Sequence, residues 1–170
     1  MSERSERANE TAPSARSAGP DRTAVVERLR ATVRDLVSLT SGVPEEHLSR
    51  EPEPGEWPVD MVVAHLADAE LVWGLRLRTM LTADEPDLAA FDQDVWADRF
   101  GGLDEEVHLS LARWRALRES NLRVFHSLDD EEWENAGVHE ERGRITVADL
   151  ATILADHDKA HLDQIRHALR

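Results

Sequence analysis

Four long segments of this sequence carry apolar residues at intervals of three and four, and this periodicity constrains the fold more than any other feature. Apolar side chains at that spacing form one stripe along an α-helix, and the stripe must be buried against neighbouring helices. The segments run from about Thr23 to Leu39, Pro58 to Leu81, Asp104 to Leu128, and Thr146 to the C-terminus. No segment shows the sustained alternation that is typical of paired strands. The sequence therefore predicts an all-α protein, a four-helix bundle.

The segments between the helices are unequal in length. A long connector, Thr82 to Leu103, separates the second and third helices and contains FDQDVWADRF, a candidate short helix. The loop from Pro44 to Trp57 is rich in proline and glutamate, which argues against regular helix or strand there. Thr146 with Asp149 three residues later resembles a capping box at the start of the fourth helix. Because of the long connector, the bundle need not follow simple up-down-up-down order.

The first 22 residues differ in composition from the rest of the chain. They are rich in Ser, Arg, Glu and Ala and lack apolar periodicity, which predicts a disordered tail at 1–22 before a single domain at 23–170. They also lack the apolar core of a secretory signal. No apolar run approaches the roughly 18 to 20 residues that cross a bilayer. We therefore expect a cytoplasmic protein that does not enter the membrane.

Charge and cysteine content exclude several classes of function. The chain has 35 Asp and Glu against 20 Lys and Arg, a net charge of −15, which opposes binding to nucleic acid or anionic lipid. It has no cysteine, so disulfides, thiolate metal sites and cysteine nucleophiles are excluded. Any metal must be held by histidines and carboxylates, and 8 histidines are present.

Three histidines lie on the predicted apolar stripes. His157 and His161 are four residues apart, so both imidazoles share one face of the fourth helix and can converge on one ion. His65 lies on the stripe of the second helix. Together they form a candidate three-histidine site that leaves coordination positions open. The alternative is that the rings pair with carboxylates, Asp68 for example, or lie at a partly wet edge of the core.

Four further residues are candidates for the surroundings of such a site. Asp68 follows His65 by three residues and shares its face, so its carboxylate could accept a hydrogen bond from a ligand histidine and orient that ring. Asp94, in FDQDVW, is a candidate pocket acid or base, and Gln164 follows His161 by three. His139 precedes the fourth helix and could overhang a pocket. Each residue also fits a role as a cap or surface group.

Three stretches of the sequence resemble the DinB-like family of four-helix-bundle proteins. They are PGEWPVDMVVAHLADAE, FDQDVWADRF and GVHEERGRITVADLATILADHDKAHLDQIRHAL. The resemblance extends from about Thr23 to Leu169. Relatives in this family include YfiT-like metal-dependent hydrolases and bacterial thiol S-transferases.

The resemblance implies a divalent metal, nickel or zinc, with His65, His157 and His161 as its ligands. Relatives in the family often dimerise, so it also allows a homodimer. The sequence departs from the common Trp-Ser or Trp-Thr start of the second helix, because Trp57 is followed by Pro58. That change affects the helix cap and leaves the ligand untouched.

The leading hypothesis is an enzyme that transfers a low-molecular-weight thiol to electrophilic small molecules, with the thiolate activated by the three-histidine metal site. A metal-dependent hydrolase using metal-bound water is the first alternative. A non-catalytic stress-response bundle that binds metal or ligand is the second. A bundle without metal, whose histidines pair with acids, is the third.

Overall fold

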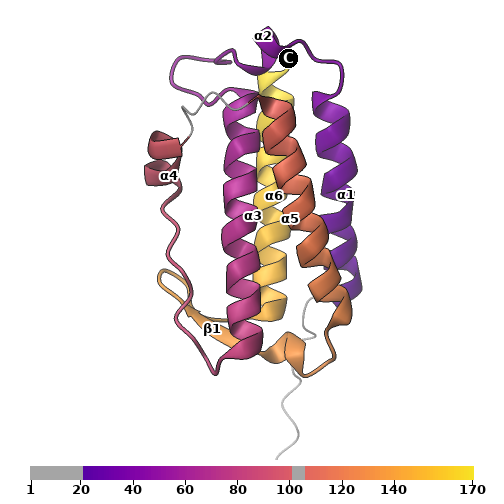
Figure 1. Ribbon diagram of the computed structural model, residues 1–170, viewed down its shortest axis with the longest axis vertical. Coiled ribbons are helices and arrows are strands. Elements are labelled where there is room, and N and C mark those ends of the chain that lie inside the picture. The colour runs from indigo at the N-terminus through magenta and orange to yellow at the C-terminus, as the bar shows by residue number, and fades with distance from the viewer. Residues whose placement is uncertain (1–20, 101–105) are drawn as a thin grey trace, which may run out of the picture.

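Four long helices form the body of the protein. The computed structural model describes residues 21–100 and 106–170, and Figure 1 shows its long helices packed side by side. They are α1 (Arg22–Thr40), α3 (Val59–Thr82), α5 (Val107–Ser127) and α6 (Val147–Ala168). The predicted all-α four-helix bundle is confirmed. None of the helices in the described part of the chain is long and apolar enough to cross a membrane.

The ends of two helices differ from the sequence-based expectation. Most of the predicted tail, residues 1–20, lies outside the described residues. The Asp21 side chain accepts hydrogen bonds from the first amides of α1, and Arg22 begins this helix, so both belong to the bundle rather than to a tail. The third long helix begins at Val107, and the predicted start at Asp104 lies outside the described residues.

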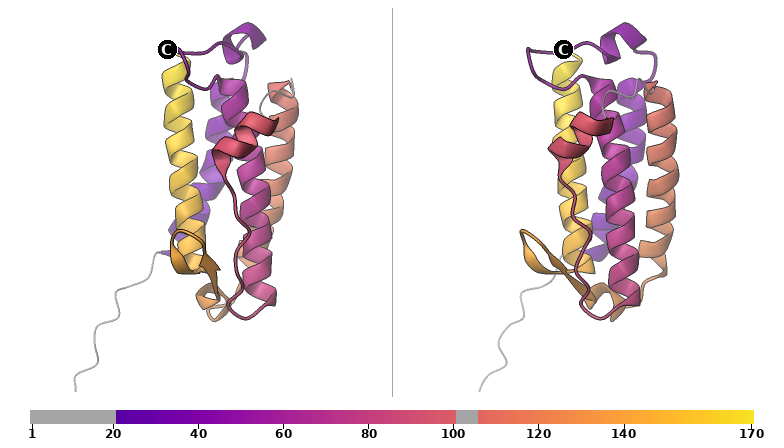
Figure 2. Two further views of the ribbon diagram at one scale, coloured as in Figure 1. Left: turned by 90° about the vertical axis from the view of Figure 1, so that its left-hand side faces the viewer. Right: turned by 60° about the vertical axis from the view of Figure 1, so that its left-hand side comes forward.

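The long helices follow an up-down-down-up order. In Figures 1 and 2, α3 and α5 run in one direction and α1 and α6 run in the other. Ion pairs agree with this arrangement. Arg22 at the start of α1 lies 2.7 Å from Asp130, just after α5, whereas Asp35 and Arg166 join the later parts of α1 and α6 at 3.7 Å. The parallel pair α3 and α5 explains the long connector, because the chain must return along the whole bundle between them.

Short elements occupy the connections. They are α2 (Glu45–Leu48), α4 (Gln93–Phe100), the 3-10 helix η1 (Glu132–Glu134), and strands β1 (Ala136–His139) and β2 (Gly143–Thr146). The short helix expected in FDQDVWADRF is confirmed as α4. The expectation of no helix between residues 44 and 57 is wrong for the single turn of α2. The strands were not predicted, because four residues place only two side chains on each face, too few for alternation to be visible.

The connector and the hairpin are joined to each other on one face of the bundle. Hydrogen bonds link Leu88 N to Val138 O at 2.9 Å and Val138 N to Pro86 O at 2.8 Å. From there the connector runs along the face formed by α3 and α6, and α4 crosses it (Figure 2). The predicted capping box at the start of α6 is also present, with Thr146 and Asp149 bonded reciprocally. This cap fixes the point at which the hairpin enters α6.

A buried polar layer divides the apolar core into two clusters. The cluster beside the hairpin contains Leu29, Trp73, Leu77, Phe125, Leu150 and Leu154. The cluster beside the C-terminus contains Leu36, Val62, Leu66, Trp114, Leu162 and Ile165. Between them lie the fully buried side chains of Arg118, Glu70 and Asp158.

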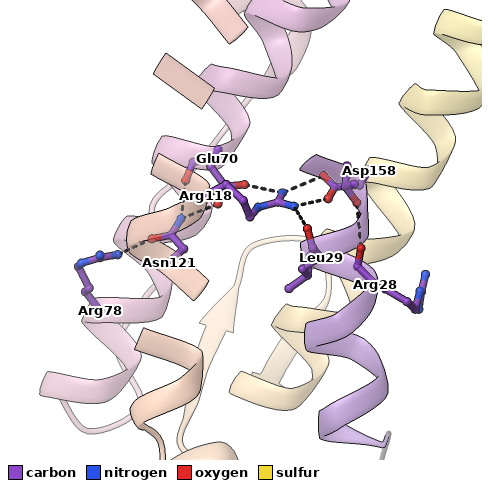
Figure 3. A network of polar contacts seen from close by, with 8 residues as sticks. Arg28, Leu29, Glu70, Arg78, Arg118, Asn121 and Asp158 are labelled. Atoms are coloured by element: carbon purple, nitrogen blue, oxygen red, sulfur yellow. Dashed lines mark hydrogen bonds and ion pairs between the residues drawn. The ribbon is translucent and has the colours of Figure 1, made fainter. Parts of the chain in front are cut away.

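Arg118 of α5 contacts all three other long helices (Figure 3). Its guanidinium donates to Asp158 Oδ2 of α6 at 2.7 Å, to Glu70 Oε2 of α3 at 2.7 Å and to the Leu29 carbonyl of α1 at 3.0 Å. Asn121 donates to Glu70 Oε1 at 2.7 Å and so completes the layer. Burial acts to lower the pKa of Arg118, but the Asp158 and Glu70 carboxylates together raise it above its ordinary value.

Gly74 allows the close approach of α3 and α5 beside this layer. A Cβ atom at this position would lie 2.6 Å from Asn121 Oδ1. We expect Gly74→Ala to lower the free energy of unfolding by about 1–3 kcal/mol through overpacking, although alanine is the better helix former by about 1 kcal/mol. Urea unfolding followed by circular dichroism measures the change. A stabilised variant would show that Asn121 can move without cost.

Candidate metal centre

Three histidines converge between α3 and α6. His65 lies on α3, and His157 and His161 lie one turn apart on α6. One ring nitrogen from each lies within 4.8 Å of the other two. In the described part of the chain this is the one group of three or more potential ligands that is close enough to hold a metal ion. The spacing of four on α6 and the antiparallel packing of α3 bring the three rings together.

The distances suit a metal ion. His65 Nε2 and His157 Nε2 are 3.2 Å apart. Two nitrogens bound at about 2.1 Å in a tetrahedral site are about 3.4 Å apart, so this pair already has nearly the required separation. Three imidazoles leave at least one position for a water molecule or a substrate. The residues present therefore fit a divalent cation such as zinc or nickel.

The protein environment keeps the three rings neutral. Burial, followed by repulsion from His161 and His157, lowers the pKa of His65 to about 3. Burial, followed by the charges of His161 and Arg118, lowers the pKa of His157 to about 3. Burial also lowers the pKa of His161, against the opposing hydrogen bond to Gln164. Neutral imidazoles have a free lone pair, which is the form that binds metal.

The Nδ1 atoms of the two rings on α6 have different surroundings. His161 Nδ1 lies 2.8 Å from Gln164 Oε1, and because an amide oxygen only accepts, Nδ1 carries the proton and Nε2 is left free for a metal. His157 Nδ1 is buried and has no hydrogen-bond partner. The other ring nitrogen, Nε2, faces Nε2 of His65 at 3.2 Å, so it is through Nε2 that His157 would bind a shared cation.

Aromatic residues from two loops enclose His65. The ring of Phe91, in the connector, stacks on it with centroids 5.9 Å apart and planes 18° apart. The ring of Trp57, before α3, lies 5.3 Å away at 59°. Because His65 is only 5% exposed, access to the cluster is from the side of α6.

A cavity of about 870 Å³ opens beside the cluster and includes His157 in its wall. The other walls are formed by α3, the connector and the hairpin loop, through Trp73, Arg76, Phe91 and His139 among others. A second cavity of about 520 Å³ includes His161 and Gln164. Gln93 and Asp94, at the start of α4, form part of both cavities. The cluster thus lies between two cavities.

The structure places the four other candidate residues in different surroundings. Asp94 and His139 both lie on the wall of the larger cavity, and Gln164 bonds to His161. Asp68 lies 3.5 Å from Arg113 of α5. Among these candidates, Gln164 has an amide oxygen placed to orient the ring of His161.

Comparison with known proteins assigns the chain to a family. The family model of the DinB superfamily matches residues 5–165. This chain belongs to the DinB superfamily. A candidate metal-dependent hydrolase of Oceanobacillus iheyensis is 28% identical to this DinB-superfamily protein over 144 residues, which are 85% of this chain and 83% of the relative. A second candidate hydrolase of that organism is 31% identical over 138 residues, 81% of this chain and 75% of the relative.

A solved structure supports the fold of this DinB-superfamily protein. YfiT from Bacillus subtilis, described as a candidate metal-dependent hydrolase with an unusual four-helix bundle topology, superposes with a TM-score of 0.81. The match covers 94% of this chain and 91% of YfiT at 20% sequence identity. The up-down-down-up order of the helices is consistent with that description.

Two residues of the site region were not singled out from the sequence of this DinB-superfamily protein. Phe91 begins the motif FDQDVWADRF, and an aromatic residue before the polar DQD run is a signal for a loop that packs against the core. Arg76 falls between Trp73 and Leu77 of the apolar stripe. A charged residue in that position is a signal for a buried cation with a specific task.

Removal of the Gln164 side chain tests its role toward His161. We expect Gln164→Ala to weaken zinc binding by about 10–100-fold, because His161 loses the group that fixes its tautomer and ring orientation. Zinc affinity is measured by competition with a chromophoric chelator. The matched control is Asp163→Ala, the adjacent exposed residue on α6, which should bind zinc like the wild type. Equal affinity of both variants would contradict the orienting role.

Proposed function

We propose that this protein is a metal-dependent hydrolase that acts on a small molecule bound in the cavity beside His157. The observation that carries the proposal is the convergence of three neutral imidazoles next to a cavity of about 870 Å³. The candidate hydrolases of Oceanobacillus iheyensis, which match most of this chain, support the same reaction class.

His65, His157 and His161 hold the cation, for which zinc and nickel are both suitable given an all-nitrogen ligand set. When bound, such a cation acts as a Lewis acid and lowers the pKa of a coordinated water molecule toward neutrality. Gln164 keeps Nε2 of His161 directed at the cation, and the Phe91 and Trp57 rings shield His65 from bulk water.

Asp94 is the residue that we assign to proton transfer. It lies on the walls of both cavities that flank the cluster, at the start of α4. A carboxylate in that place accepts a proton from the attacking nucleophile and returns it to the leaving group. His139, which lines the larger cavity from the end of β1, contacts the substrate.

Transfer of a low-molecular-weight thiol to an electrophile is the second candidate function. The size of the larger cavity favours it, because about 870 Å³ is near the upper end of the range for one drug-sized ligand and has room for a thiol beside a small electrophile. The same three histidines serve this reaction, with a thiol taking the place of water as the nucleophile.

One set of assays separates these functions. Tag-free protein loaded with zinc or nickel is incubated with activated esters and amides, and separately with a thiol and a bimane electrophile. Metal-dependent release of the acid supports hydrolysis, and metal- and thiol-dependent conjugation supports transfer.

In either assay, Asp94→Asn should lower kcat by about 10²–10⁴-fold. Asp98→Asn, an exposed position of α4 that lies on neither cavity wall, is the control. The absence of turnover in both assays would leave a bundle that only binds metal or ligand.

A further inference from the structure

Arg76 is a buried cation without a carboxylate partner among the described residues. Its side chain lies on the wall of the larger cavity and is only 4% exposed. Its Nε and Nη2 atoms both donate to the Ala89 carbonyl, at 3.0 and 2.7 Å, and its guanidinium lies 4.7 Å above the centre of the Trp73 ring. Arg118, in contrast, is neutralised by two buried carboxylates.

The Ala89 carbonyl cannot balance this charge. A guanidinium has five N–H donors, and the neutral carbonyl accepts from only two of them. The charge that remains is costly to keep out of water unless an anion approaches it. Burial lowers the pKa of Arg76, and the Glu141 carboxylate opposes this effect only partly. These features describe a cation that is preorganised for a partner that the described residues do not supply.

The acidic residues of the cavity do not provide that partner. Its wall also contains the side chains of Asp92, Asp94, Glu140, Glu141 and Asp156, and all of them are exposed. Exposed carboxylates are hydrated and screened by salt, and Asp156 is already paired with Arg28. Arg76 is therefore a buried positive charge in a cavity whose exposed side chains include five carboxylates.

We propose that Arg76 binds an anionic group of the substrate, a carboxylate or a phosphate, in the cavity that His157 also lines. The planar guanidinium matches the two oxygens of either group, and the Trp73 ring beneath it holds the plane in position. This inference rests on the proposed function, because it takes this cavity as the substrate site.

The position of Arg76 also limits the length of the substrate. Arg76 follows His65 by 11 residues on α3, an axial separation of about 16 Å at 1.5 Å per residue. Arg76 and His157 line the same cavity, so the substrate must be long enough to reach both the guanidinium and the histidine cluster.

Anion binding is tested on the full-length, metal-free protein, so the result does not depend on metal chemistry. Sodium phosphate and sodium acetate are titrated in separate arms against sodium chloride at constant ionic strength. The Trp73 indole N–H signal, assigned with Trp73→Phe, is followed by NMR. We expect a saturable shift with phosphate, acetate or both, and the arm that saturates at lower concentration identifies the preferred anion. A shift with neither anion, or an equal shift with chloride, would overturn the proposal.

Two pairs of variants locate the binding group. Arg76→Gln should abolish the saturable shift, whereas Arg142→Gln, an exposed arginine of the same cavity, should retain it. Because Arg76→Gln also loses the bonds to Ala89, a second pair uses exposed positions only. Glu141→Gln should tighten phosphate binding about threefold by removing a nearby negative charge, and Glu140→Gln should tighten it less. Unchanged binding in Glu141→Gln, or retained binding in a folded Arg76→Gln, would refute the assignment.

The outcomes for Arg76 and for the proposed function are distinguishable. Hydrolysis or thiol transfer by the loaded wild type, together with no anion binding to the metal-free protein, would overturn only the role of Arg76. Anion binding that depends on Arg76, without turnover in either assay, would leave the anion site standing and overturn the proposed enzymatic function.

Discussion

Replacement of Arg118 by methionine is expected to lower the free energy of unfolding by about 3–5 kcal/mol. The variant leaves the buried carboxylates of Glu70 and Asp158 without their cation, and both side chains are only 1% exposed. It also removes the bond from Arg118 to the Leu29 carbonyl, the polar link of this layer to α1. Uncompensated buried charge, rather than the loss of any single hydrogen bond, makes the effect large.

Urea unfolding at neutral pH measures this effect. The control is Arg123→Met, a change of the same type at an exposed residue of α5 that pairs with Glu119. It should stay within about 0.5 kcal/mol of the wild type. Addition of Glu70→Gln and Asp158→Asn to Arg118→Met should recover part of the loss, because both unpaired charges are removed. A loss below about 1 kcal/mol in Arg118→Met would mean that water reaches the layer and solvates the carboxylates.

The helices of this protein follow from its sequence, but the burial of individual residues does not. Periodicity predicts the four long helices because each is at least five turns long and carries an apolar stripe. On α5 the hydropathy of the sequence favours Leu117 as a core residue, yet Arg118 is fully buried and Leu117 only partly buried. Hydropathy favours burial of leucine over burial of arginine. It carries no information on Glu70 and Asp158, which are distant in sequence and neutralise Arg118 in the fold.

The histidine cluster could be predicted from the sequence, but the cavity beside it could not. The proximity of His157 and His161 follows from one helical turn, and His65 joined them because it lies on an apolar stripe. The cavity beside them is formed by the connector and by a hairpin of four-residue strands. Its position depends on the bonds between Val138 and the connector, which carry no sequence pattern. The surroundings of Arg76 therefore could not be predicted, because they depend on the connector, which supplies the Ala89 carbonyl and part of the cavity wall.

Replacement of His157 or His161 by alanine is expected to weaken zinc binding by more than about 100-fold. Removing a residue that only orients a ligand costs up to about 100-fold, and these variants remove a ligand itself. Each variant keeps two imidazoles, that of His65 on α3 and the remaining one on α6. Metal content of tag-free protein and chelator competition measure the affinity directly. Unfolding provides a second measure, because zinc at 100 times its Kd stabilises the wild type by about 2.7 kcal/mol and should not stabilise either variant.

The metal-free stability of these variants separates loss of a ligand from loss of the fold. Burial holds the pKa of the His157 ring at about 3, so this ring is a desolvated polar group in the metal-free protein. Its removal should change the urea midpoint of that form little, because the desolvation cost disappears together with the packing of the ring. His108→Ala, at an exposed position of α5, is the control and should keep wild-type zinc affinity. Equal zinc content in the wild type, His157→Ala and His161→Ala would show that the three nitrogens do not share a cation, and the case for catalysis at this cluster would then be lost.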